Sequence, residues 1–153
     1  MCPFGMTNIE FHVNLADKLH YSCRLLRKVY RTGSKVVVTA EPELLLQLDQ
    51  LLWQYSSTEF LPHCLIDSAA PTLAATPIVL AEQLDACPAG SVGSVLINLG
   101  QQVPGGFERF ERFIEVASSL EADRLAARDR WKHYRDRGYL LKRHELQAVT
   151  EAA

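Results

Sequence analysis

The sequence predicts a single Rossmann-like α/β domain, with a largely parallel sheet and helices on both faces. Its 153 residues suit one domain. Strand patterns alternate with helical patterns along the chain, which is typical of α/β architecture with right-handed crossovers. The short run at 35–39 is largely β-branched, as in strands that are covered on both faces. A hydrophobic share of 48% and a charged share of 22% indicate a globular chain.

The N-terminal part predicts two strand–helix pairs. Apolar residues at every second position indicate a strand over 7–13, and helical spacing follows over 15–30. Gly33 separates this helix from the strand at 35–39. A second helix is expected over 41–53, with a proline at an early helical position and a stripe of leucines.

The C-terminal part predicts two further strands and two helices. The strands are expected at 77–80 and 94–99, and the intervening stretch 82–93 should be mainly loop because it contains proline and glycine. Helices are expected over 107–117 and 120–138. Three phenylalanines spaced three apart are interpreted as the buried face of the first of these helices, with Glu–Arg pairs outside.

Several classes of protein are disfavoured by composition. A net charge of −2 argues against a globally basic nucleic-acid binder, and the chain has neither an apolar run of membrane-spanning length nor a recognisable secretory signal. The cysteines are widely spaced and are expected to be reduced thiols, some of them buried. His63-Cys64 has no second ligand pair, so no metal or other cofactor is expected. The four cysteines are Cys2, Cys23, Cys64 and Cys87.

Sequence signals for catalysis or nucleotide binding are weak. No glycine fingerprint follows the first strand, and the stretch 31–35 precedes a strand, whereas a phosphate-binding loop follows one. None of the five histidines falls in a recognisable nucleophile or metal motif. A nucleotide-binding α/β enzyme therefore remains an alternative function, but no sequence motif supports it.

Positive charge is concentrated near the C-terminus. Residues 121–144 carry eight basic and four acidic side chains, a net charge of +4, which leaves −6 for the other residues. Helical geometry places Arg124, Arg128, Trp131 and Arg135 within a sector of about 60°. Guanidinium groups around an indole suit an acidic peptide with a hydrophobic end. They also suit single-stranded nucleic acid, and a solvated basic face with Trp131 as a partly buried edge residue is equally consistent.

A second aromatic pair, Trp53 and Phe60, lies at the end of the predicted 41–53 helix and in the loop beyond it. Composition favours a place in the core for such residues. If they are exposed instead, they are candidates for a binding hot spot.

Together these stretches resemble the chi subunits of the bacterial DNA polymerase III holoenzyme, which are clamp-loader accessory proteins. The resemblance spans about residues 6–143, with 1–5 as an N-terminal extension and 144–153 as a frayed tail. It rests on four groups of residues: Gly33-Ser-Lys35 with Val36-Val-Val38, Leu48-Asp49 with Leu52-Trp53, Phe60-Leu-Pro-His63, and Arg128-Asp-Arg-Trp-Lys132 with Tyr134-Arg135 and Gly138-Tyr139.

The resemblance implies a cytoplasmic, non-catalytic adaptor at replication forks that has no cofactor and contacts DNA only indirectly. One implied partner is the psi subunit, replaced in some members by a DNA-repair helicase, at a surface that includes Trp53 and Phe60. The other is the acidic, phenylalanine-terminated tail of the single-stranded-DNA-binding protein. The residues implied for the tail are Arg124, Arg128, Trp131, Lys132 and Arg135, with Val116 as an apolar wall beside Trp131.

Overall fold

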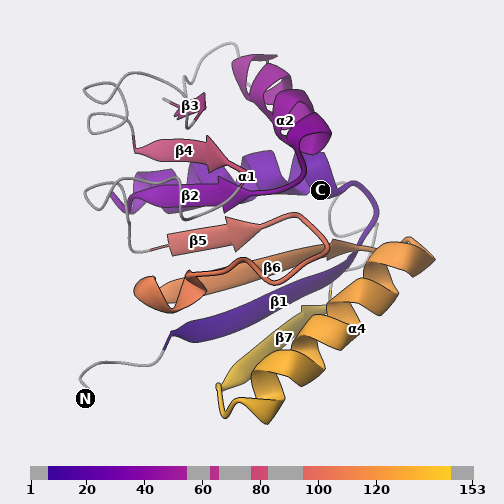
Figure 1. Cartoon of the computed structure of the whole chain (residues 1–153). Coiled ribbons are helices and arrows are strands. Elements are labelled where there is room, and N and C mark those ends of the chain that lie inside the picture. The colour runs from indigo at the N-terminus through magenta and orange to yellow at the C-terminus, as the bar shows by residue number, and fades with distance from the viewer. Residues whose placement is uncertain (1–6, 55–62, 66–76, 83–94, 146–153) are drawn as a thin grey trace.

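A seven-stranded, entirely parallel sheet forms the centre of the protein (Figure 1). The computed structural model describes residues 7–54, 63–65, 77–82 and 95–145. The strand order is β3-β4-β2-β5-β6-β1-β7. The strands are β1 (Asn8–Leu15), β2 (Val36–Thr39), β3 (His63–Leu65), β4 (Ile78–Ala81), β5 (Val95–Asn98), β6 (Arg112–Ser118) and β7 (Leu141–Glu145).

Helices cover both faces of the sheet, which confirms the predicted fold class. Helices α1 (Lys18–Arg31) and α2 (Pro42–Gln54) pack on one face. Helix α4 (Glu121–Asp136) and the short 3₁₀ helix η3 (Phe107–Arg109) pack on the other. In Figure 1, α4 runs alongside β7 at the end of the sheet opposite β3. No helix in the described part of the chain is long and apolar enough to cross a membrane.

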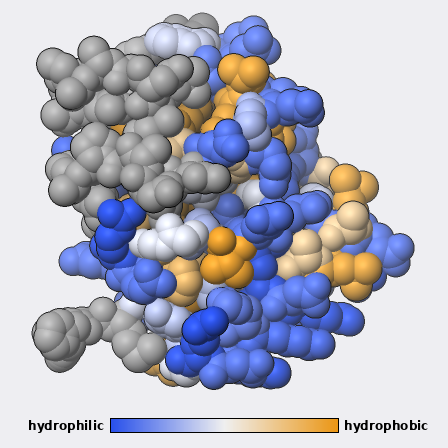
Figure 2. Space-filling model, viewed as in Figure 1, coloured by the Kyte–Doolittle hydropathy of each residue, from blue (hydrophilic) through white to orange (hydrophobic). Residues whose placement is uncertain are grey.

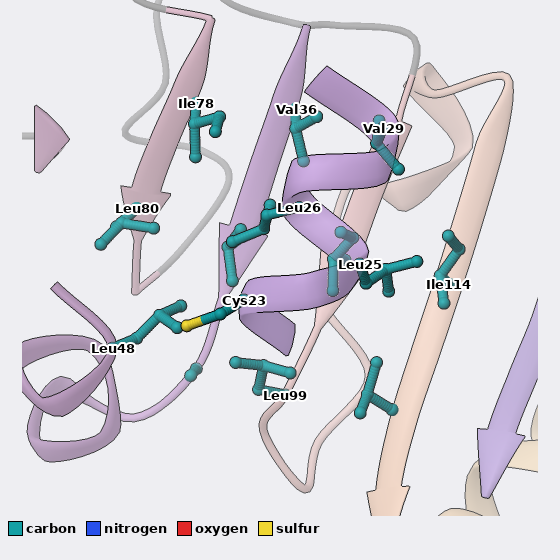
Figure 3. Packing of buried hydrophobic residues seen from close by; sticks show 14 of the residues in the cluster. Cys23, Leu25, Leu26, Val29, Val36, Leu48, Ile78, Leu80, Leu99 and Ile114 are labelled. Carbon is teal, nitrogen blue, oxygen red and sulfur yellow. The ribbon is translucent and has the colours of Figure 1, made fainter. Parts of the chain in front are cut away.

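The face under α1 and α2 is closed by an aliphatic core (Figure 3). Cys23 and Leu26 of α1 are completely buried, as is Leu48 of α2. These side chains pack on the alternate residues of the central strands that point toward them, including Ile78 and Leu80. Cys23 is a free cysteine, buried as the sequence predicts for some of the thiols, and burial raises its pKa to about 12.

The face under α4 is closed largely by aromatic rings. Phe107, Phe113 and Tyr134 are almost completely buried, and their ring centroids lie 5.2–5.6 Å apart in edge or tilted contacts. Such contacts add about 0.5–1.5 kcal/mol per pair beyond simple burial. This aromatic layer holds α4 against the sheet.

The prediction of a helix over 107–117 is wrong. Phe107 lies in η3, the chain then straightens, and β6 inserts between β5 and β1. Gly106, with a φ of 95°, turns the chain into η3. All three phenylalanines of this stretch are buried, as expected, but from two different elements. Strand β6 is covered on both faces, so it lacks the alternation that would have identified it.

Besides β6, two further strands were not predicted, β3 and β7. Strand β7 extends to Glu145, two residues beyond the predicted domain boundary at 143. The other predicted strands and helices are present within a few residues of their expected limits. The predicted loop at 82–93 lies outside the described residues from 83 onward, as does the loop that holds Phe60.

Candidate functional site

Helix α4 is anchored at its N-terminus by a buried carboxylate. Asp123 accepts hydrogen bonds from the backbone N–H of Ser118 at 2.7 Å and from Nζ of Lys18 at 3.0 Å. Lys18 also donates to the backbone carbonyl of Leu99 at 2.7 Å. These bonds tie the start of α4 to the ends of β5 and β6 and fix the direction of the basic helix.

One residue of the basic stretch does not contribute to its surface charge. Arg130 is 3% exposed, and its Nε lies 3.0 Å from Oε1 of the fully buried Glu115. Asn98 and Tyr134 donate hydrogen bonds to the same carboxylate. Burial raises the pKa of Glu115, against the opposing effect of the Arg130 charge and these donors.

The outer residues of α4 border a pocket of about 340 Å³ between α4 and the ends of β1, β6 and β7. Its apolar floor includes Phe11, Ala117 and Ala127, all at least 95% buried. Asn14, with a φ of 64°, lines it at the point where the pairing of β1 with β6 becomes irregular. The remaining lining residues are Val13, Ser118, Arg124, Arg128, Trp131, Arg143 and Glu145.

Trp131 forms a wall of this pocket. Its ring packs edge-on against the buried ring of Phe11, with centroids 5.1 Å apart and planes at 66°. The indole is therefore held by the aromatic core while part of it faces the pocket. An aromatic wall held in this way loses little conformational entropy when a ligand packs against it.

Guanidinium groups surround the apolar floor. Arg124, Arg128 and Arg143 line the pocket, against the single carboxylate of Glu145. Glu145 lies 3.3 Å from Arg143. Arg124 has a longer ion pair, of 3.9 Å, with the exposed Glu121. Arg128 is exposed and forms no ion pair with the other described residues. The pocket therefore combines an apolar floor with an excess of positive charge, which suits an anion that carries a hydrophobic group.

The outer surface of α4 is otherwise hydrophilic, apart from apolar residues near its N-terminal end (Figure 2). Leu120 and Leu125, from that end, are 72% and 45% exposed. They extend the apolar surface available beside the basic residues.

The structure brings together three of the tail-site residues expected from the sequence, namely Arg124, Arg128 and Trp131. Lys132 and Arg135 are exposed on α4 but do not line the pocket, and Arg135 lies 3.6 Å from Asp136. The expectation for Val116 is wrong. It packs into the core under α1 because alternate residues of a strand point to opposite faces.

Several residues that line the pocket were missed, and three of them matter most to its shape and charge. Ala117, next to Val116, provides the apolar wall that was assigned to Val116. Phe11 was recognisable only as part of an alternating strand pattern. Arg143 was counted in the basic stretch, but its place in the pocket depends on β7, which has a polar sequence and gave no strand signal.

The second predicted surface is described only in part. Trp53 is 57% exposed at the end of α2, so its interpretation as a core residue is wrong. Its ring lies 4.7 Å from that of His63, whose Nε2 is 3.1 Å from a carboxylate oxygen of Asp49. His63 thus packs with Trp53 and lies beside Asp49. Phe60 lies outside the described residues.

A larger cleft of about 780 Å³ lies at the carboxyl ends of the neighbouring strands β2 and β5. The chain continues from β2 to α2 on one face of the sheet and from β5 to η3 on the other. Ligands of open α/β sheets often bind at such a position. Here Glu41, which precedes α2, lines the cleft and accepts a hydrogen bond from the backbone N–H of Gln101 at 3.2 Å. Its negative charge opposes binding of a phosphate group at the start of α2.

Comparison with known proteins agrees with the resemblance seen in the sequence. The family model described as "DNA polymerase III chi subunit, HolC" matches residues 6–142. The chain is 33% identical over 149 residues to the DNA polymerase III subunit chi of Pseudomonas aeruginosa, covering 94% of this chain and 100% of the relative. It is 31% identical over 128 residues to the subunit of the same name from Haemophilus influenzae, covering 78% and 81%. The chain therefore belongs to the DNA polymerase III chi subunit family.

Proposed function

We propose that this chain is a non-catalytic accessory subunit in DNA replication that links the psi subunit of the clamp loader to the acidic C-terminal tail of the single-stranded-DNA-binding protein. Family membership supports the accessory role. The observation that carries the tail assignment is the pocket beside α4, in which an apolar floor is surrounded by three arginines.

The chemistry of the tail matches the two parts of this pocket. The ring of its terminal phenylalanine packs on the floor of Phe11, Ala117 and Ala127, against the edge of Trp131. A pocket of about 340 Å³ lies in the size range of small-ligand sites. Arg128 and Arg124 bind the terminal carboxylate and the preceding aspartates, since a guanidinium group can hold a carboxylate by two hydrogen bonds.

The psi subunit, or a DNA-repair helicase in its place, is assigned to the surface around Trp53 and Phe60. Support comes from the indole of Trp53, because a large aromatic side chain that is more than half exposed at a helix end is typical of a hot spot. Trp53 belongs to α2, whereas the pocket beside α4 lies on the opposite face of the sheet. Both partners can therefore bind at the same time.

Fluorescence anisotropy of a labelled acidic peptide ending in phenylalanine tests the tail assignment. We expect micromolar binding that requires the terminal phenylalanine and weakens as salt is added, because exposed charge pairs are screened. Arg128→Ala should weaken binding by about 1–3 kcal/mol. Arg137→Ala is the matched control, since Arg137 is an exposed arginine just beyond α4 that does not line the pocket.

Two outcomes would contradict the assignment: equal binding of the truncated peptide, or equal losses in the two arginine variants. Binding of single-stranded DNA alone would instead support the nucleic-acid alternative. A rise in the melting temperature with added nucleotide would support the enzyme alternative.

A further inference from the structure

Three side chains that can bind metals meet at the β7 edge of the sheet, on the face opposite the tail pocket. Glu10 and His12 extend from β1, and His144 extends from the neighbouring position on β7. The carboxylate Oε1 of Glu10 lies 3.3 Å from Nε2 of His12 and 3.8 Å from Nε2 of His144. The ligand atoms of all three residues lie within 4.8 Å of one another.

These distances are close to those of a bound zinc ion. Zinc bonds of 2.0–2.1 Å in a tetrahedral site place neighbouring ligand atoms about 3.3–3.4 Å apart. The pair of Glu10 and His12 already has this separation. The side chain of His144 is 51% exposed, so it can move toward the other two ligands when an ion binds. Two imidazoles and one carboxylate leave one tetrahedral position for water.

The surrounding residues orient two of the three ligands. The hydroxyl of Tyr21 makes a hydrogen bond with Nδ1 of His12, which leaves Nε2 directed toward Glu10. Arg112 donates from Nε to Oε2 of Glu10 at 2.9 Å and from a terminal nitrogen to Oε1 at 3.2 Å. Supporting hydrogen bonds of this kind are typical around metal ligands. The charge of Arg112 repels a cation and sets the affinity below that of a structural zinc site.

We propose that Glu10, His12 and His144 form a binding site for a divalent transition metal ion, with Zn²⁺ as the fitting ion. Imidazole nitrogen with carboxylate oxygen is a donor set that zinc accepts. The ion joins β7 to β1. Arg143 and Glu145, on either side of His144, line the tail pocket on the other face of the sheet, so the ion also braces the outer wall of that pocket.

Calorimetric titration of the full, reduced chain with Zn²⁺ tests this site. We expect binding of one ion to the wild type and a loss of affinity of about tenfold or more in Glu10→Gln and His144→Ala, on the scale of metal-site variants. The matched control is His20→Ala, because His20 is an exposed histidine 3.8 Å from a carboxylate oxygen of Asp17, outside the cluster. The four cysteines are the same in all variants, so binding by thiols cancels in the comparison.

A structural readout accompanies the titration. Zn²⁺ should shift the amide resonances of β1 and β7 in the wild type and in His20→Ala, but not in His144→Ala. It should also raise the melting temperature in the first two proteins only, because a ligand that binds the folded state stabilises it. Absence of Zn²⁺ binding to the wild type would overturn the proposal. Equal affinities in the wild type and His144→Ala would overturn it as well.

Discussion

The two faces of the sheet are closed in different ways. Two helices and a continuous aliphatic core close the face under α1 and α2. One helix, an aromatic layer and the buried Glu115–Arg130 ion pair close the face under α4. A single helix does not cover the ends of β1, β6 and β7, and the pocket beside α4 lies at this uncovered position. The comparison shows that aliphatic packing closes the first face, whereas the second face leaves a pocket between its helix and the strand ends.

The buried ion pair should give the largest effect. Glu115→Ala removes the carboxylate and leaves Arg130 buried without its counter-charge, which costs about 3–5 kcal/mol of unfolding free energy. Urea denaturation of the purified variant measures this cost. A loss below about 1 kcal/mol would show that water or another group compensates Arg130.

The reverse variant, Arg130→Met, should be less destabilising because Glu115 can take up a proton. The pKa of Glu115 is already raised in the folded state, and loss of Arg130 raises it further. A raised pKa favours the folded state at low pH, and this contribution is lost as the pH rises through the folded-state value. The stability deficit of Arg130→Met relative to the wild type should therefore shrink as the pH is lowered toward 4.5, the ordinary value for a glutamate. A deficit that does not change with pH would contradict this role of Glu115.

A cavity in the aliphatic core should lower the unfolding free energy but leave peptide binding at the pocket beside α4 unchanged. Leu26 is fully buried in α1, so Leu26→Ala should lower the unfolding free energy by about 2–5 kcal/mol. Measured under conditions where the variant is folded, its affinity for the acidic peptide should equal that of the wild type. Weaker peptide binding by the folded variant would mean that the two faces are coupled.

The two tryptophans should separate the two binding surfaces. Trp131→Ala should weaken binding of the acidic peptide by about 1–3 kcal/mol without unfolding the domain, because only part of the ring is in the core. Trp53→Ala is the matched control and should leave peptide binding unchanged, since Trp53 lies on α2. The same anisotropy assay measures both variants, and a reversed order of effects would exchange the two assignments.

Periodicity was sufficient to predict the elements that have one buried face or a short β-branched run. Helices α1, α2 and α4 and strands β1, β2, β4 and β5 are of this kind. Strand β6 was assigned to a helix because the phenylalanines of 107–113 recur at every third position. The strand lacks a competing alternation because both of its faces are buried. Strand β7 consists mostly of exposed polar residues, so its place depends on pairing with β1 and not on its own pattern.

The candidate site was predictable only where it belongs to a single helix. The 3.6-residue period grouped Arg124, Arg128 and Trp131 correctly. Phe11 and Arg143 join them through contacts between distant segments, which no local pattern reveals. The choice of Val116 instead of Ala117 was an error of one residue, and on a strand such an error changes the face of the sheet.

Binding of the tail to the face under α4 is tested most directly by titrating the ¹⁵N-labelled chain with the phenylalanine-terminated acidic peptide and recording amide NMR spectra. The largest shifts should appear at Ala117, Ser118 and Arg143 and along 124–131, with little change in α1 and α2. Shifts confined to α1, α2 or the surroundings of Trp53 would contradict binding at this face.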